Sequence, residues 1–220
     1  MGTRLKSVVA DVPKPMAKVA ERPFLTYILD DLDKQGFDKI VLAVGYKYEV
    51  IQSHFGHRYK NLQLLYSVED SPLGTGGAIR KAFDLLDEDH AFVINGDTFL
   101  EMNYAEMEAY AKAQAADLCM ALKPMKAFDR YGSITLDGRR IIRFNEKQFI
   151  DEGLINAGIY RMKKSLIEHW PVGEKFSFET EVMEKEVANR LFIGQLIEGY
   201  FIDIGIPEDF ARAQNEFSQY

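Results

Sequence analysis

The sequence predicts an α/β fold, with a mixed and mostly parallel sheet flanked by helices and a small antiparallel insertion. Three observations support this prediction. Amphipathic stretches with helical spacing alternate with short apolar stretches through residues 24–123. Two further apolar stretches flank Asp137-Gly138, a dipeptide typical of a hairpin turn. We see no low-complexity linker or internal repeat, so we expect a single domain over residues 1–220.

The elements of the first half follow from spacing and from residues that break helices. Residues 24–37 predict a helix, because apolar side chains recur on one face and Gly36 ends the pattern. After it we expect a strand at 40–44, a helix at 48–56, a strand at 62–69, a glycine turn leading into a helix at 71–86, a strand at 90–97, a helix at 104–116 and a strand at 117–123.

The second half contains the antiparallel insertion. Residues 132–144 predict two strands joined at Asp137-Gly138. The elements expected after this hairpin are a strand at 154–162, a helix at 176–190, strands at 191–199 and 200–205, and a final helix at 207–218. Pro207 suits the first position of that last helix, and the two acids after it suit the helix dipole.

Composition narrows the class of protein. The formal net charge of −7 argues against general binding to nucleic acid or to a membrane surface. No apolar stretch approaches the length of a membrane span. The one cysteine, Cys119, cannot form an internal disulfide, and we expect it to pack in the core of a cytoplasmic protein.

The first candidate site is the opening loop GTRLKSVVADVPKP. Backbone N–H groups of a glycine turn at Gly2 and Thr3 can bind anionic oxygens, and Arg4 offers a planar fork for phosphate. Lys14 adds a movable charge, and the prolines on both sides of it favour an extended backbone. The alternative interpretation is a surface loop with two solvated cations.

The second candidate is the segment SPLGTGGAIRKAF. Its glycines lead into a helix whose N-terminal amides are expected to be free for a phosphate, and they also suit the close approach of a flat base. The segment is not a Walker loop, and Ile79 occupies the place where a dinucleotide fingerprint needs Gly or Ala. A plain connection between a strand and a helix is the alternative.

The third candidate is a pair of acids. Asp97 follows the apolar strand of INGDTF, and Asp203 lies among apolar residues in YFIDIGIPEDF. Ligands of open α/β sheets bind at the ends of strands, and a carboxylate beside phosphates indicates Mg²⁺. Each acid has the alternative role of forming a turn or a cap.

The fourth candidate is a polar set in RFNEKQF and LINAGIY. Glu146 and Lys147 end one apolar strand, while Asn156 and Gly158 interrupt the next. A carboxylate, an ammonium group and an amide together suit a sugar phosphate, which needs partners for its hydroxyls and a cation for its phosphate. A solvated loop is the alternative.

Taken in order, the motifs GTRL, PKP, LGTGGA, NGD, RYG, EK, NAG and IDIG resemble those of the sugar-1-phosphate nucleotidyltransferases over essentially the whole chain. Within that family, FDRYGSITL, GLINAGIY, KFSFE and YFIDIGIPEDF are most similar to D-glycero-D-manno-heptose-1-phosphate guanylyltransferases. The next most similar are mannose-1-phosphate guanylyltransferases and the uridylyl- and thymidylyltransferases. The resemblance implies a Rossmann-like nucleotidyltransferase fold.

The resemblance also implies a role for each candidate. Arg4, Lys14 and Asp97 would be catalytic, and Asp97 and Asp203 would bind Mg²⁺. The nucleotide would be bound by Gly2, Thr3, Arg4, Glu69, Leu73, Gly74 and Thr75. The sugar phosphate would be bound by Tyr131, Gly132, Glu146, Lys147, Asn156 and Gly158.

The implied reaction transfers a nucleotidyl group, with GTP expected as donor, to a sugar 1-phosphate, expected to be the manno-configured heptose, and releases pyrophosphate. A uridylyl- or thymidylyltransferase, a mannose-1-phosphate guanylyltransferase and a non-catalytic sensor of nucleotides or sugar phosphates are the alternatives. A dehydrogenase is disfavoured by the failed fingerprint. Relatives in the family carry a strand ending in two glycines before the GTRL loop, so we expect this first strand to be missing from the given sequence. The sequence leaves a homo-oligomer open.

Overall fold

The computed structural model describes residues 12–219, and the chain folds as two compact units that we describe one at a time. The first unit comprises the described part of Met1–Ser71 together with Asn95–Glu101 and Tyr200–Tyr220. The second comprises Pro72–Ile94 and Met102–Gly199. Gly2, Thr3 and Arg4 lie outside the described residues, so the structure does not test the expectation that the family's first strand is missing before them. No helix within residues 12–219 is long and apolar enough to cross a membrane.

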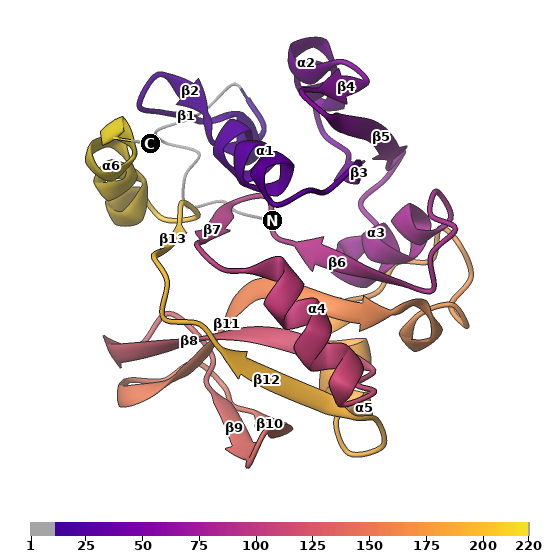
Figure 1. Cartoon of the computed structure of the whole chain (residues 1–220), viewed down its shortest axis with the longest axis vertical. Coiled ribbons are helices and arrows are strands. Elements are labelled where there is room, and N and C mark those ends of the chain that lie inside the picture. The colour runs from indigo at the N-terminus through magenta and orange to yellow at the C-terminus, as the bar shows by residue number, and fades with distance from the viewer. Residues whose placement is uncertain (1–11, 220) are drawn as a thin grey trace. The chain divides into compact units, whose positions relative to one another are not determined.

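Three small sheets and three α-helices make up most of the first unit as far as the structure describes it (Figure 1). Its elements are η1 (Lys14–Met16), β1 (Lys18–Val19), β2 (Arg22–Pro23), α1 (Phe24–Lys34), β3 (Lys39–Val44), α2 (Tyr48–Phe55), β4 (Arg58–Tyr59), β5 (Leu62–Val68), β7 (Thr98–Leu100), β13 (Phe201–Asp203), α6 (Pro207–Glu216) and η4 (Phe217–Gln219). The sheets are β1–β2, β7–β13 and β3–β5–β4, in which β3 and β5 are parallel.

The core of the first unit is built around Phe217, which is 1% exposed. Its ring makes edge contacts with Tyr27 of α1 and Phe99 of β7, at centroid distances of 4.7 and 5.4 Å. Helix α1 presents Phe24, Leu25, Ile28, Leu29 and Leu32 as buried residues, as the apolar spacing predicts. One aromatic side chain from the end of the chain therefore joins the first helix to the strand that follows Asp97.

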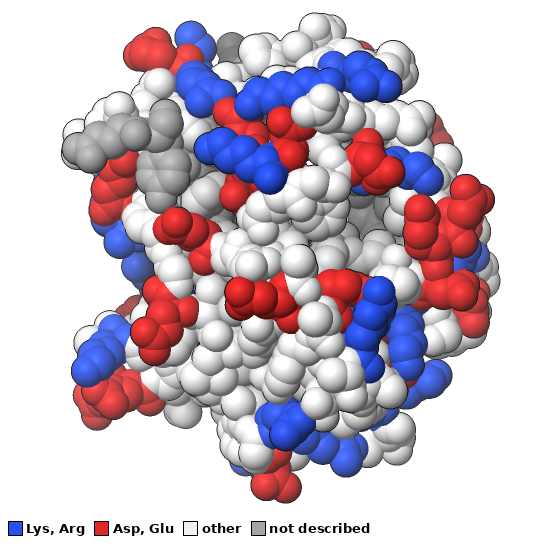
Figure 2. Space-filling view, viewed as in Figure 1, with Lys and Arg blue, Asp and Glu red and all other residues white. Residues whose placement is uncertain are grey.

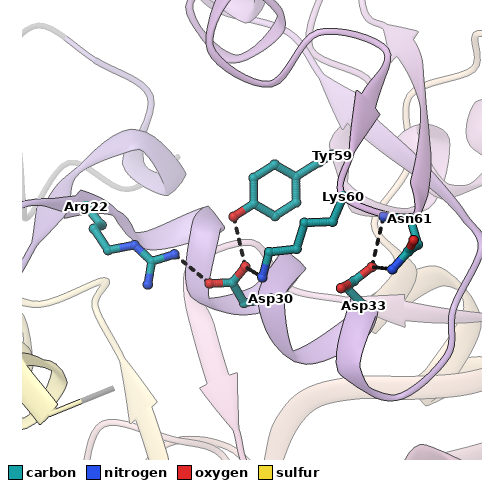
Figure 3. Close-up of polar contacts among 6 residues, drawn as sticks. All are labelled: Arg22, Asp30, Asp33, Tyr59, Lys60 and Asn61. Carbon is teal, nitrogen blue, oxygen red and sulfur yellow. Dashed lines mark hydrogen bonds and ion pairs between the residues drawn. The ribbon is translucent and has the colours of Figure 1, made fainter.

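Two carboxylates of α1 fasten this helix to its neighbours (Figure 3). Asp30 accepts hydrogen bonds from Arg22 at 2.5 Å and from Tyr59 at 2.8 Å, and it pairs with Lys60 at 2.5 Å. Asp33 accepts two bonds from Asn61, both at 3.0 Å. Burial alone would raise the pKa of Asp30, but the bonds from Lys60, Arg22 and Tyr59 lower it. The carboxylate therefore stays charged and holds the β1–β2 and β4–β5 turns against α1.

A six-stranded sheet forms the centre of the second unit, in the order β6–β11–β8–β12–β10–β9 (Figure 1). The elements of this unit are α3 (Gly74–Phe83), β6 (His90–Ile94), α4 (Tyr104–Ala113), β8 (Leu118–Phe128), β9 (Ile134–Asp137), β10 (Arg140–Phe144), β11 (Ile150–Lys163), η2 (Lys164–Leu166), η3 (Phe178–Met183), α5 (Glu184–Glu186) and β12 (Phe192–Leu196). Helix α4 lies across one face of the sheet, and it contacts β8 and β11.

The predicted mixed α/β architecture is confirmed, but antiparallel pairing has a larger share than the sequence indicates. Among the described strands, only β3 with β5 and β12 with β8 pair in parallel. The long strand β11 runs antiparallel to both of its neighbours, β6 and β8. The alternation of helices and strands suggests parallel pairing, yet it cannot show that the later strand β11 enters between β6 and β8.

Two local expectations for the second unit have different outcomes. Cys119 is fully buried in β8, and burial raises the pKa of its thiol to about 12, as expected for a packing residue. The helix expected over 176–190 forms only as the π-helical turn η3 and the short α5. Ser177 caps the start of η3, since its hydroxyl accepts from the N–H of Thr180, and the N–H of Phe178 donates to the distant Thr75 hydroxyl.

Glu108 of α4 connects that helix to the sheet. Its carboxylate accepts from Arg161 of β11 at 2.9 Å and pairs with Lys112 at 2.9 Å and His90 at 3.2 Å. Burial would raise the pKa of Glu108, but the bonds from Arg161 and Lys112 prevail and lower it to about 2. The Arg161 side chain is only 6% exposed, so it depends on this carboxylate for neutralisation.

We expect Glu108→Gln to lower the free energy of unfolding at pH 7 by about 2–3 kcal/mol, because it leaves a buried guanidinium without its counter-charge. A carboxylate whose pKa is lower in the folded than in the unfolded protein stabilises the folded state fully at pH values above the unfolded-state pKa. This stabilisation is lost as the pH falls through the folded-state pKa. The difference from the parent protein should therefore shrink between about pH 4.5 and pH 2. Urea unfolding at several pH values measures it, with exposed Glu184→Gln as the matched control. A difference that does not depend on pH would contradict this account.

Candidate functional site

Lys14, Asp97 and Asp203 come together in the first unit. Lys14 Nζ lies 3.1 Å from Asp97 Oδ2. Asp203 pairs with Thr98 in the β7–β13 ladder, and the N–H of Ile204 donates to the Asp97 carbonyl. A Cβ at Gly205 would lie 2.7 Å from Asp203 Oδ1 and 3.3 Å from Lys14 Nζ, so the cation and this carboxylate flank one glycine. Residues separated widely in the sequence therefore form one charged cluster.

The backbone at Lys14 differs from the extended form that its two flanking prolines suggest. Lys14–Met16 is a 3₁₀ turn, in which the N–H of Met16 donates to Pro13 and the N–H of Ala17 donates to Lys14. Pro15 fits this turn because its φ is already close to helical and its missing N–H is not needed in a first turn. Pro15 also packs on Gly96, where a Cβ would lie 3.2 Å from its Cγ. This contact fixes the turn beside Asp97.

The electrostatics of the cluster favour a cation. Burial raises the pKa of Asp203 above its usual value, the N–H bond from Gly205 lowers it, and the negative charge of Asp97 raises it further. Two carboxylates in this arrangement provide the oxygen ligands that Mg²⁺ prefers. Within residues 12–219, no group of three or more His, Cys, Asp or Glu side chains lies close enough to hold a metal ion. The pair therefore fits a Mg²⁺ that completes its coordination with substrate oxygens or water.

Glu69, the remaining expected site residue of the first unit, directly follows β5. Its N–H donates to the carbonyl of Val44 at 2.7 Å, and this bond continues the β3–β5 pairing by one residue. The side chain is half-buried, and its Cβ lies 3.6 Å from the position that a Cβ on Gly45 would take. The end of the strand thus sets the position of this carboxylate.

The glycine segment of the second unit serves the chain's own packing. A Cβ on Gly76 would lie 2.2 Å from two ring atoms of Phe176, and a Cβ on Gly77 would lie 2.3 Å from the Glu174 carbonyl. Gly74 has a φ of +72°, and a Cβ on it would lie 2.5 Å from the Phe176 carbonyl oxygen. The expectation of free amides at this helix start is wrong for Gly76 and Gly77, because both N–H groups donate to the Phe176 carbonyl. These glycines are needed because segment 174–176 lies against α3.

Thr75 is held by a residue that sequence reasoning missed. Its hydroxyl donates to Glu179 at 2.5 Å and accepts from the N–H of Phe178 at 2.9 Å. The Glu179 carboxylate also accepts from the Ser177 hydroxyl at 2.9 Å. The stretch KFSFE carried the resemblance in the sequence, but nothing in its spacing indicates contact with a residue more than a hundred positions earlier. The structure shows that it supports the start of α3.

The expected sugar-side residues of the second unit lie on neighbouring segments. Ser133 bridges to Ile155 of β11, next to Asn156, and its carbonyl accepts from the N–H of Asn145. A Cβ on Gly132 would lie 2.6 Å from the Asn145 carbonyl, so the Tyr131-Gly132 segment runs against the residue before Glu146. Glu146 and Lys147 are exposed. Ser133 and Asn145 thus hold three distant segments together.

Asn156 is engaged with its own strand rather than free. Its Nδ2 donates to Tyr160 at 2.7 Å, and its Oδ1 accepts from the N–H of Gly158 at 2.8 Å. Gly158 has a φ of +74°, and the β11–β8 register shifts between Asn156 and Tyr160. This bulge bends the strand and changes its direction, and such bulges are common next to binding sites. The structure places Asn156 at the bulge with a fixed orientation.

Known proteins similar to this chain identify its family. The model of the Nucleotidyl transferase family matches residues 1–219. The chain belongs to the nucleotidyl transferase family. The chain is 46% identical over 220 residues to the D-glycero-alpha-D-manno-heptose 1-phosphate guanylyltransferase of Aneurinibacillus thermoaerophilus. The match covers 100% of this chain and 96% of that protein.

A solved structure agrees with this chain in both fold and sequence. HddC from Yersinia pseudotuberculosis superposes with a TM-score of 0.88 at 36% identity, covering 99% of this chain and 95% of that one. The same protein complexed with GMP-PN gives a TM-score of 0.86 over the same shares of the two chains. The nucleotidyltransferase fold expected from the ordered motifs is therefore confirmed.

Proposed function

We propose that the protein transfers GMP from GTP to D-glycero-α-D-manno-heptose 1-phosphate and releases pyrophosphate. The observation that carries the proposal is 46% identity, over the full chain, to a guanylyltransferase of that name. The ordered motifs found in the sequence support the same reaction. We further propose that residues 1–220 act as one nucleotidyltransferase domain and that the reaction takes place in the cytoplasm.

In this reaction, an oxygen of the sugar 1-phosphate attacks the α-phosphorus of GTP. The bond from the α-phosphorus to the oxygen bridging to the β-phosphate breaks, and that oxygen leaves with pyrophosphate. The nucleophile is already an anion, so no general base is needed, and the protein acts by positioning and by neutralising charge. Lys14 is suited to the second task because its ammonium lies next to Asp97 rather than in open solvent.

Asp97 and Asp203 would hold Mg²⁺, which would neutralise negative charge on the nucleotide phosphates when bound. Their arrangement supports this role, since the pKa of Asp203 is raised by burial and by the charge of Asp97. We also propose that Gly2, Thr3 and Arg4 bind phosphate, and that Glu69, Leu73, Gly74 and Thr75 bind the base. The sugar-phosphate side would use Tyr131, Gly132, Glu146, Lys147, Asn156 and Gly158.

A pyrophosphate-release assay with a panel of nucleotides and sugar phosphates tests the proposal. GTP should exceed UTP and dTTP by at least about tenfold in kcat/KM with the heptose 1-phosphate, because a carboxylate acceptor left facing a pyrimidine is partly unpaired. Glu69→Gln should reduce the preference for GTP, whereas Glu184→Gln, at an exposed position, should not change it. If UTP or dTTP were used as well as GTP, the assignment as a guanylyltransferase would be refuted, but the assignment as a nucleotidyltransferase would stand. Turnover of mannose 1-phosphate in preference to the heptose would refute the proposed acceptor.

A further inference from the structure

The segment 174–179 lies against the glycine turn at the start of α3, where the base of the nucleotide is proposed to bind. The N–H of Phe176 donates to the Leu73 carbonyl at 3.0 Å, and the Phe176 carbonyl accepts from the N–H of Gly76 at 3.0 Å. The segment then enters η3, a π-helical turn, and such turns are rare and frequent at functional sites. The position of this segment therefore helps to set the shape of the turn.

The hydroxyl of Thr75 is occupied by the same segment. It donates to Glu179 Oε2 at 2.5 Å and accepts from the N–H of Phe178 at 2.9 Å. A hydroxyl has a single proton, so that of Thr75 cannot also donate to a nucleotide. In contrast, the N–H groups of Gly74 and Thr75 donate to no other residue within 12–219. The donor that Thr75 can offer to a nucleotide is therefore its backbone N–H, and its side chain serves to fix that backbone.

Glu179 holds this arrangement from within the segment. The same carboxylate oxygen that accepts from Thr75 also accepts from the Ser177 hydroxyl at 2.9 Å, so two hydroxyls fix one oxygen. Hydrogen bonds to a charged acceptor are stronger than those between neutral groups. The Glu179 side chain is half-buried, so water competes only in part for these bonds. Without this carboxylate, the proton of the Thr75 hydroxyl would lose its acceptor.

The charge around α3 favours a nucleotide at the start of this helix. Figure 2 shows acidic side chains gathered at the right-hand edge of the molecule, where Figure 1 places the loop that follows α3. The exposed acids of this loop are Asp84, Asp87, Glu88 and Asp89. Their charge and the helix dipole both disfavour an anion at the end of α3. A nucleotide is therefore expected beside Thr75 rather than at the other end of the helix.

We propose that Glu179 is a positioning residue for nucleotide binding. Its carboxylate holds the Thr75 side chain and thereby sets the backbone of residues 73–75 for the base, while Glu179 itself makes no contact with the nucleotide. This inference rests on the proposed function, because it concerns the turn that is proposed to bind the base.

The proposed sugar-phosphate side is held by other contacts. The ring of Phe178 packs on that of Tyr160, with 5.7 Å between their centroids, and the Tyr160 hydroxyl accepts from Asn156. None of these three contacts is a bond to Glu179. A change at Glu179 should therefore weaken the binding of the nucleotide and leave the use of the sugar phosphate nearly unchanged.

Isothermal titration calorimetry of the full chain with Mg²⁺ tests the proposal. The Kd values of GTP, UTP and dTTP are measured, and the nucleotide that binds the parent most tightly is used for the variants. Glu179→Ala should raise this Kd about tenfold, because it removes a charged acceptor. In the pyrophosphate-release assay, the KM for the sugar 1-phosphate should change less than about twofold. Glu184→Ala, at an exposed position, is the matched control and should bind the nucleotide as the parent does.

Conservative variants separate positioning from direct contact. Glu179→Gln keeps an acceptor oxygen for both hydroxyls and should bind the nucleotide nearly as the parent does. Thr75→Val removes the hydroxyl at similar size and should weaken binding as much as Glu179→Ala does, whereas Thr75→Ser should restore it. Because Thr75 and Glu179 act through one hydrogen bond, the double variant should bind no worse than Thr75→Val alone. Melting temperatures show whether each variant is folded.

The outcomes that overturn the proposal differ from those that overturn the proposed function. Parent-like binding by Glu179→Ala, an equal loss in Glu179→Gln, or additive losses in the double variant would overturn the positioning role alone. If UTP or dTTP binds most tightly, the guanylyltransferase assignment fails, and the same variants still decide the role of Glu179. A parent protein that binds none of the three nucleotides would overturn both.

Discussion

Replacing Asp97 by Asn should reduce turnover about a thousandfold while leaving the protein folded. Asp97 is proposed to bind Mg²⁺ together with Asp203, and the charge of a metal on a transferring phosphoryl group is worth several kcal/mol, with each 1.36 kcal/mol equal to about tenfold in rate. Asn keeps the size of the side chain but removes its negative charge. The Asp97 side chain is 32% exposed, so the substitution leaves no deeply buried group without a partner.

Pyrophosphate release at increasing Mg²⁺ concentration measures this effect, and the melting temperature shows whether the fold is kept. Asp203→Asn should behave in the same way, because both carboxylates lie beside Lys14. Exposed Asp87→Asn is the matched control and should retain full activity. Normal turnover by Asp97→Asn at ordinary Mg²⁺ concentration would show that this carboxylate is not a metal ligand.

The sequence predicts well what depends on local spacing. Helix α1 and the strand pair β9–β10 form where apolar periodicity and the Asp137-Gly138 turn indicate. The meeting of Asp97 and Asp203 was also accessible, because Asp97 follows an apolar strand and Asp203 lies among the apolar residues of another. In each case the information lies within a few neighbouring residues.

What the sequence does not predict depends on contacts between distant segments. The path of β11 between β6 and β8 is set by pairing across the unit, and no local pattern encodes it. Similarly, the amides of Gly76 and Gly77 are occupied by the carbonyl of Phe176, about a hundred residues later. A glycine-rich helix start has the same local appearance whether a ligand or another part of the chain lies against it. Only the position of Phe176 distinguishes the two cases.

The contact with Phe176 predicts that Gly76→Ala destabilises the protein, the opposite of the usual effect of this substitution in a helix. Gly76 lies within α3, where replacing glycine by alanine normally stabilises a helix by about 1 kcal/mol. Here the new Cβ would lie 2.2 Å from the Phe176 ring, which is 7% exposed and stacks on Trp170 at 4.6 Å. The ring cannot move without disturbing that stack, so Gly76→Ala should destabilise by about 1–3 kcal/mol, as overpacked cores do.

In a protein of this size, that loss corresponds to a melting temperature about 2–12 °C lower, which calorimetry can measure. Gly45→Ala is the matched control, because its Cβ would make an ordinary contact of 3.6 Å with Glu69 and should change the melting temperature little. The decisive comparison is made in a Phe176→Ala background, where the ring atoms that clash are absent. There Gly76→Ala should be neutral or stabilising, so the two substitutions should be strongly coupled in a double-mutant cycle. If Gly76→Ala destabilises equally in both backgrounds, the glycine is required for a reason other than Phe176.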